Sequence, residues 1–370
     1  MRRLSCLILM ILLILILAAG CGRNQSKDNG NPVVSGSSIA DQTDQNADKS
    51  LDTADTGQQA NINNAGTTAA NLSPSSQTDT SIAADETVSL IISKDFGGQT
   101  LVEKQVAIQK DWTVIDLLES TARITTKWDG SFVNSLEGLE ADNGGILGNK
   151  RDWFYFVNGI CADVGASGYD LKAGEVVWWD YHAWKNMGST NSAVIGCYPE
   201  PFIHGYRGKV GPTTIISSAD NLNLAGNLQK AIKNRGVASV NLAELNNNLL
   251  ENRQVPTILI VTWNEVKQLA WLESFNKAYR KTGVSVHFTD QGLELLDYNG
   301  DVAQTINGSA GVIVASGSGL GDANPLWLLV GTDQQGLQQA VDLLVSNPQK
   351  IVKCYNAAVV SGELIRLPLQ

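Results

Sequence analysis

The first patterned region of the chain begins near Glu86 and predicts a hairpin followed by a helix. The runs TVSLIIS (87–93) and LVEKQVAIQ (101–109) have the alternation and composition of β-strands, and the glycines between them supply a turn. In DWTVIDLLES (111–120) the apolar residues instead recur at helical spacing. The region is therefore expected to fold as strand, strand, helix.

The predicted helix has a start signal and an apolar face. Thr113 and Asp116 have the spacing of a capping box, in which the two residues satisfy backbone N–H groups of the first turn. Val114, Leu117 and Leu118 then share one face of the helix. That face is expected to pack on a sheet.

Two later strand-like runs, DWFYFVNG (152–159) and GEVVWWDYHAW (174–184), complete the order β-β-α-β-β. A small mixed sheet with one helix across one face fits this order, which is the β-grasp arrangement. We place this domain at residues 86–198.

After Pro199 the pattern changes to short apolar strands that alternate with helical segments. Helical spacing of apolar residues covers 264–282, with Gly283 at the C-cap position, and 334–346, with Asp333 as N-cap. The alternation predicts an α/β-type domain at 199–370, so the fold class of the chain is α+β. The strand-like runs of this region are 213–218, 257–263, 284–290, 311–316 and 326–333.

The chain opens with MRRLSCLILMILLILILAAGC, in which two arginines precede an apolar run and small residues. Residues 1–20 are predicted to be a secretory signal peptide. The small residues that end at Cys21 resemble the lipobox of bacterial lipoproteins, which implies a lipid anchor on Cys21. The alternative is an uncleaved N-terminal membrane helix. Both interpretations place the rest on the extracytoplasmic face of the bacterial cell membrane.

Residues 21–85 are polar, without one aromatic residue, and are predicted to be a disordered linker because they cannot bury enough apolar surface to fold. The net charge of -10 and the absence of a basic stripe argue against nucleic acid as a partner. Beyond the signal and Cys21, the cysteines are Cys161, Cys197 and Cys354. Their spacing is not a disulfide framework or a zinc site, and a Cys161–Cys197 bond is left open.

The segment 152–181 carries a resemblance to the bacterial domain of unknown function DUF4430, the transcobalamin-like C-terminal domain. It resembles the family in four short motifs: Trp-x-Tyr-x-Val-Asn-Gly, Gly-Ala-Ser, Tyr-x-Leu-x-x-Gly-Asp and an apolar-x-Trp-x-Tyr strand. Glu175 replaces the usual Asp of the third motif. The matching positions are Trp153, Tyr155, Val157, Asn158, Gly159, Gly165, Ala166, Ser167, Tyr169, Leu171, Gly174, Val177, Trp179 and Tyr181.

This resemblance implies a β-grasp fold and a corrinoid ligand. In the vertebrate cobalamin carriers that the domain resembles, it closes over cobalamin opposite a helical barrel. This chain has no such barrel, since its second half is the α/β-type segment. Cobalamin is therefore a possible ligand, no cofactor is required, and a membrane importer is a possible partner.

Strand alternation divides 176–184 into two faces. Trp179 and Tyr181, shared with the family, are expected to face the helix. The other face is expected to form an exposed ligand-binding surface of aromatic and polar groups. The alternative is that the second domain packs on this surface and covers it. The residues expected on it are Trp178, Asp180, His182 and Trp184.

Asn158, Ser167 and Tyr169 are further candidate ligand contacts, although Asn158-Gly159 also has the composition of a tight turn and the loop 165–169 that of plain turn chemistry. The glycines of ASGSGLGD (315–322) are followed by a strand and not by a helix, so they predict a strand-to-strand loop and not a phosphate site. No metal site is predicted.

No catalytic motif is present, so the chain is predicted not to be an enzyme. The first hypothesis is a membrane-tethered lipoprotein that binds a small molecule, with a corrinoid favoured. The second is a surface module that binds a protein or a wall glycan, and the third is a hydrolase.

Overall fold

The computed structural model describes residues 86–128, 132–142, 150–185 and 190–370. The predicted signal peptide at 1–20, the anchor at Cys21 and the linker at 21–85 lie outside these residues. None of the described helices is long and apolar enough to cross a membrane.

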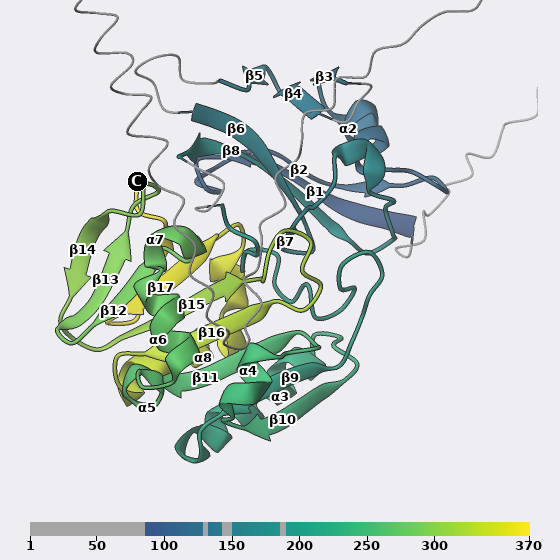
Figure 1. Ribbon diagram of the computed structural model, residues 1–370. Helices are drawn as coiled ribbons and strands as arrows, with labels where there is room; N and C mark the ends of the chain where they lie inside the picture. The colour runs from purple at the N-terminus through teal and green to yellow at the C-terminus, as the bar shows by residue number, and fades with distance from the viewer. Residues whose placement is uncertain (1–85, 129–131, 143–149, 186–189) are drawn as a thin grey trace, which may run out of the picture. The chain divides into compact units, whose positions relative to one another are not determined.

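The N-terminal half is built on a five-stranded sheet of order β2-β1-β8-β6-β7, shown at the top of Figure 1. β1 and β8 run parallel and the other neighbours antiparallel. This is the mixed sheet that the pattern predicted. Its elements are β1 (Thr87–Lys94), β2 (Gln99–Ala107), α2 (Val114–Thr121), β6 (Lys150–Val157), β7 (Ile160–Cys161), the 3-10 turn η2 (Ala166–Gly168) and β8 (Val176–Trp184).

Helix α2 begins where the capping box predicted. The Thr113 backbone N–H donates to the Asp116 carboxylate at 2.7 Å. Its apolar face, which includes Leu117 and Leu118, is fully buried in one core with Trp179 and Tyr181. The expectation that these two aromatic residues face the helix is confirmed.

A small second sheet in this half was not predicted. It has the order β3-β4-β5 and consists of β3 (Ile124–Lys127), β4 (Phe132–Leu136) and β5 (Leu139–Glu140). Its strands are two to five residues long and β3 is mostly exposed, so no run of apolar residues marks them in the sequence.

The C-terminal half is built on a seven-stranded sheet of order β10-β9-β11-β16-β15-β17-β18. The strands from β10 to β16 in this order are mutually parallel, and the neighbours from β16 to β18 are antiparallel. This agrees with the predicted α/β-type layers. The strands are β9 (Thr213–Ser217), β10 (Val240–Glu244), β11 (Thr257–Thr262), β15 (Ala310–Ser316), β16 (Leu326–Gly331), β17 (Asn356–Val360) and β18 (Glu363–Leu367).

Separate layers cover the two faces of this sheet. Helices α3 (Leu222–Lys233) and α8 (Gln334–Ser346) pack together on one face. Short helices and a three-stranded sheet cover the other face (Figure 1). The remaining elements are η4 (Ala219–Asn221), α4 (Asn247–Glu251), α5 (Trp263–Val266), α6 (Ala270–Lys277), α7 (Tyr279–Thr282), β12 (Val286–Thr289), β13 (Gly292–Leu296), β14 (Val302–Ile306) and η5 (Pro348–Ile351).

The helix predicted at 334–346 is confirmed, with the Asp333 carboxylate accepting from the Gly336 N–H at 2.8 Å. The single helix predicted at 264–282 is wrong. It is three short helices, because Leu269 adopts an extended conformation between α5 and α6. Gly283 does end the last of them, in the left-handed conformation with φ of 70°.

The two halves share a hydrophobic core and several cross-contacts. The Gly321 N–H donates to the Cys161 carbonyl at 2.8 Å, and the Gly317 N–H to the Ser192 hydroxyl at 2.7 Å. Residues 317–322 of the glycine-rich segment therefore lie in the loop between β15 and β16, as predicted, and these contacts hold the halves together. Cys161, Cys197 and Cys354 are free and buried.

Candidate functional site

The face of β8 opposite α2 was expected to be an open aromatic surface, and that expectation is wrong. Trp178 and Asp180 are fully buried and His182 is buried. Tyr355, the residue before β17, packs on Trp178 with ring centres 5.2 Å apart. The alternative, in which the second domain covers this face, is the arrangement found.

Asp180 is the centre of a hydrogen-bonded cluster that we call the Asp180 hub, made of Ser93, Phe96, Gly97, Asp180, His182 and Tyr355. The Asp180 carboxylate accepts from the Ser93 hydroxyl at 2.5 Å and from the backbone N–H groups of Phe96 and Gly97 at 2.9 Å. The Tyr355 hydroxyl lies 3.4 Å from it. The hub therefore pins the β1–β2 turn and joins the two halves.

His182 completes the hub. Its Nδ1 lies 2.9 Å from Asp180 Oδ2 and 3.2 Å from the Tyr355 hydroxyl. The imidazole is sandwiched between Phe96 and Phe154, with ring centres 4.2 and 4.4 Å away. The Ser93 hydroxyl donates to the carboxylate and not to the imidazole, so this is not the arrangement of a nucleophile activated by a base.

Trp184 and Ser167 keep some exposure. Trp184 is half-buried, with the Lys150 ammonium 5.0 Å from its ring centre. Ser167 is exposed on η2. Both stay predictions as ligand contacts.

The side chains of Asn158 and Tyr169 are hydrogen-bonded within the fold. Asn158 is fully buried and has a positive φ of 53°, as a tight turn requires. Its amide donates to the Gly205 carbonyl at 2.7 Å and accepts from the Val176 N–H at 2.8 Å. The Tyr169 hydroxyl donates to the Glu175 carboxylate at 2.9 Å. Neither side chain is free to meet a ligand in this conformation.

Two buried carboxyl groups lie near this turn. Burial raises the pKa of Glu175 and of Glu200 above its ordinary value. The His204 Nδ1 lies 2.5 Å from Glu200, which ties the 198–206 segment together. In the described part of the chain, no three His, Cys, Asp or Glu side chains are grouped so that they could hold a metal ion.

A polar cleft of about 290 Å³ lies in the C-terminal half, next to the ends of β11 and β16. These neighbouring parallel strands both end there, and ligands of open α/β sheets bind outside the carboxyl ends of strands. We call it the carboxyl-end cleft. It is lined by Trp263, Asn264, Lys267, Phe288, Thr289, Asp290, Gln291, Gly292, Asn307, Gly308, Ser309, Thr332 and Asp333.

Several polar side chains of the cleft have no hydrogen-bond or ion-pair partner among the described residues. They are the amides of Asn264, Gln291 and Asn307, the ammonium of Lys267 and the carboxylate of Asp290, all exposed. Such groups are available to a ligand, in contrast to those of the Asp180 hub.

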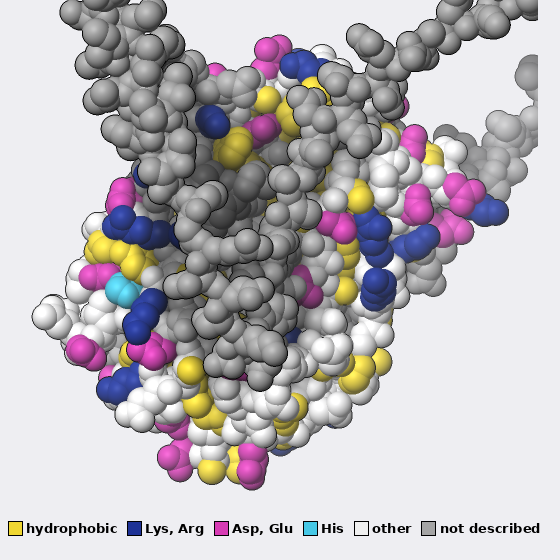
Figure 2. All heavy atoms as spheres, viewed as in Figure 1, with side chains coloured by type: hydrophobic (Ala, Val, Ile, Leu, Met, Phe, Trp, Pro, Cys, Tyr) yellow, Lys and Arg dark blue, Asp and Glu magenta, His cyan; other side chains and the backbone are white. Residues whose placement is uncertain are grey.

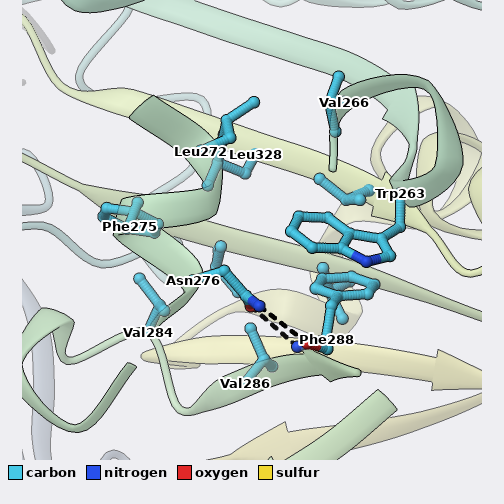
Figure 3. A pocket seen from close by; sticks show the side chains of 12 residues that line it. Trp263, Val266, Leu272, Phe275, Asn276, Val284, Val286, Phe288 and Leu328 are labelled. Atoms are coloured by element: carbon cyan, nitrogen blue, oxygen red, sulfur yellow. Dashed lines mark hydrogen bonds between the residues drawn. The ribbon is translucent and has the colours of Figure 1, made fainter. Parts of the chain in front are cut away.

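A second, apolar cavity of about 30 Å³ shares the Trp263 and Phe288 rings with the cleft. The two rings are stacked, with centres 4.8 Å apart (Figure 3). Asn276 is its one polar lining residue, and both ends of its amide are bonded to the Phe288 backbone, at 2.8 and 2.9 Å. The lining of this cavity is therefore almost entirely apolar.

The sequence did carry a signal for this cleft. Asn264, Thr332 and Asp333 come directly after the apolar runs of two predicted strands. The carboxyl ends of parallel strands meet at one sheet edge, so these residues could have been grouped from the sequence. Most of the remaining lining residues come from β12, the turn between β12 and β13 and the segment after β14, which only the fold brings there.

Figure 2 shows basic and acidic side chains interspersed on the face in view, without a single basic field.

Residues 111–183 match the family described as domain of unknown function (DUF4430). This match covers the N-terminal half from α2 to β8 and leaves the C-terminal half unmatched. No curated protein matches the chain. Among solved structures, a Ruminococcus gnavus protein described as a candidate metal binding protein is 14% identical, covering 27% of this chain and 99% of its own, with a TM-score of 0.22. At that TM-score the likeness carries no argument about this chain.

Proposed function

We propose that the protein is a membrane-tethered, extracytoplasmic binding protein whose small ligand occupies the carboxyl-end cleft. The observation that carries this proposal is the coincidence of three features. The cleft is a polar cavity of about 290 Å³, it lies at the carboxyl ends of β11 and β16, and five of its polar side chains have no partner among the described residues. The proposal assigns binding and no reaction.

The size of the cleft limits the ligand. Ligand pockets of proteins are typically about 300–1,000 Å³. At about 290 Å³ the cleft lies at the lower end of this range, so it suits one ring with its substituents and not a corrin macrocycle. Its lining is polar, which favours a hydrophilic ligand.

The proposal includes attachment of the protein to the membrane. The apolar run before Cys21 and the small residues next to it support a lipid anchor on Cys21. A binding protein held there meets ligands outside the cell and can pass them to a membrane transporter.

A soluble fragment of residues 86–370 tests the cleft, because it contains both halves of the shared core. Thermal shift against a library of sugars, amino acids and corrinoids identifies ligands, and calorimetry measures their affinity. Trp263→Ala is expected to weaken binding about tenfold or more, because it removes an aromatic wall of the cleft. Trp128→Ala is the matched control, since that side chain is 73% exposed and outside the cleft.

If every ligand found binds the Trp263→Ala variant as tightly as the wild type, the carboxyl-end cleft is not the site. A library without any binder, at ligand concentrations in the high micromolar range, overturns the binding function itself.

A corrinoid is the second candidate, favoured by the DUF4430 match at 111–183. A corrinoid on the Trp178 and His182 face needs Tyr355 to move away, since Tyr355 covers that face. An absorbance titration with cobalamin is the test, because corrinoids are coloured. Binding that Tyr355→Ala strengthens supports this site, and no binding by either protein excludes it.

A further inference from the structure

We infer that the ligand of the carboxyl-end cleft is an N-acetylated sugar unit of a glycan, an inference that rests on the cleft being the binding site. Four properties of the cleft lead to this class: its charge, its free polar groups, its partly exposed indole and the apolar cavity that shares this indole.

The charges of the cleft exclude a phosphorylated ligand. Lys267 is its one basic side chain, against the carboxylates of Asp290 and Asp333. The N-terminus of α8, which otherwise attracts anions, is already occupied by the Asp333 carboxylate that caps it. A phosphate would therefore meet a net negative site, whereas an uncharged ligand meets no repulsion.

The free groups match neighbouring hydroxyls. The side chains of Asn264, Gln291 and Asn307 each offer a donor and an acceptor, and Asp290 offers two acceptor oxygens. Two adjacent hydroxyl groups of a sugar can bond to one planar amide or carboxylate at the same time. Amino acids and simple amines present no such row of hydroxyls.

The indole supplies the apolar contact that a sugar ring needs. Trp263 is half-exposed on the cleft wall, and Phe288 stacks on it with an angle of 18° between the rings. Phe288 is buried at 7% exposure, so it holds the indole in place. The C–H groups on one face of a pyranose pack against such a ring, while its hydroxyls point to the polar groups around it.

The apolar cavity supplies the preference for an acetyl group. It shares the Trp263 and Phe288 rings with the cleft and is also lined by Val284, Val286 and Leu328 (Figure 3). Its volume of about 30 Å³ is that of a methyl-sized group, and the amide of its one Asn is bonded to the Phe288 backbone at both its oxygen and its nitrogen. An acetyl methyl beside the rings reaches this cavity, where a hydroxyl would lose its hydrogen bonds to water.

Two trisaccharides that differ only in the acetamido groups test the inference by calorimetry: the β1-4 trimer of N-acetylglucosamine and cellotriose. The fragment 86–370 is expected to bind the acetylated trimer at least about fourfold more tightly than cellotriose. This is the gain in affinity expected from burying one methyl group. Val286→Ile fills the apolar cavity and is expected to abolish this difference, leaving cellotriose affinity unchanged. Val302→Ile, at an exposed position of β14, is the matched control and keeps the difference.

The outcomes separate the two proposals. Equal affinity for the two trimers, or a difference that survives Val286→Ile, overturns the acetyl preference. If neither trimer binds, but another compound binds and is lost in Trp263→Ala, the sugar class is wrong and the cleft remains the site. If no compound depends on Trp263, the proposed function itself fails.

Discussion

The Asp180 hub and the carboxyl-end cleft contain similar residue types, but the polar groups of the hub are bonded within the fold, whereas several of those in the cleft are free. Each holds a carboxylate beside aromatic rings. In the hub, the Asp180 carboxylate is fully buried and its oxygens accept from four donors at 2.5 to 2.9 Å. In the cleft, Asp290 is exposed and has no partner among the described residues. The aromatic and polar residues that stand out in the sequence of β8 therefore join the two halves of the molecule. Residues that the sequence did not single out leave groups free for a ligand.

The largest effect is expected from breaking the hub. Asp180→Ala leaves the Phe96 and Gly97 N–H groups and the His182 imidazole without their acceptor. The free energy of unfolding of the 86–370 fragment is expected to fall by about 3–5 kcal/mol. Urea denaturation followed by tryptophan fluorescence measures it.

Asp290→Ala is the control for this experiment, because its exposed carboxylate supports no other group. Its expected effect is within about 0.5 kcal/mol. Equal losses for the two variants would contradict the distinction between hub and cleft.

A smaller effect is expected from Tyr355→Phe, which keeps the ring over Trp178 and removes only the hydroxyl. That hydroxyl lies 3.2 Å from His182 Nδ1. Its loss is expected to cost about 1 kcal/mol in the same urea experiment. A loss above about 3 kcal/mol would mean that the hydroxyl, and not the packing of the ring, holds the two halves together.

Val286→Ile is expected to stabilise the protein slightly, by about 0.5 kcal/mol, since it fills the apolar cavity beside the cleft. A rise in the midpoint of thermal unfolding checks it. Destabilisation would show that the cavity cannot accept one more methyl group, which would also weaken the inferred acetyl site.

The smallest effect is expected in the pH dependence. Burial raises the pKa of Glu175 above 4.5, so above pH 4.5 the folded state retains a proton that the unfolded state releases. This contribution to stability is complete below pH 4.5 and is lost as the pH rises through the folded-state pKa. Glu175→Gln should flatten this part of the curve of urea midpoint against pH.

Glu119→Gln, at an exposed position of α2, serves as the control and should leave the curve unchanged. A curve for Glu175→Gln that coincides with the wild type would show that Glu175 does not titrate differently on folding.

Local patterns in the sequence predicted much of the fold. The capping box at Thr113 and the period of Val114, Leu117 and Leu118 predicted α2, and alternation assigned Trp179 and Tyr181 to the helix side. These signals are local because a helix turn and a strand pleat set which side chains share a face. The short strands of the β3–β5 sheet carry no such period and were missed.

The sequence did not predict which residues pack on the face of β8 opposite α2. Tyr355 lies 175 residues after Asp180, and no periodicity near either residue records their contact. The same holds for the cleft, where Trp263 meets Phe288 and Asn307 from separate segments. The break at Leu269, which aims Leu272 and Phe275 at the apolar cavity, also depends on tertiary packing.

The turn between β1 and β2 has a consequence for how this chain is made. Arg366 donates to the Gly97 carbonyl and Gln370 to the Asp95 carbonyl, across 269 and 275 residues of sequence. The β1–β2 hairpin therefore obtains these contacts only after residues 366 and 370 have been synthesised. Contacts of such long sequence separation slow folding. A chain interrupted before β18 would leave this turn without those contacts and accessible to chaperones and proteases.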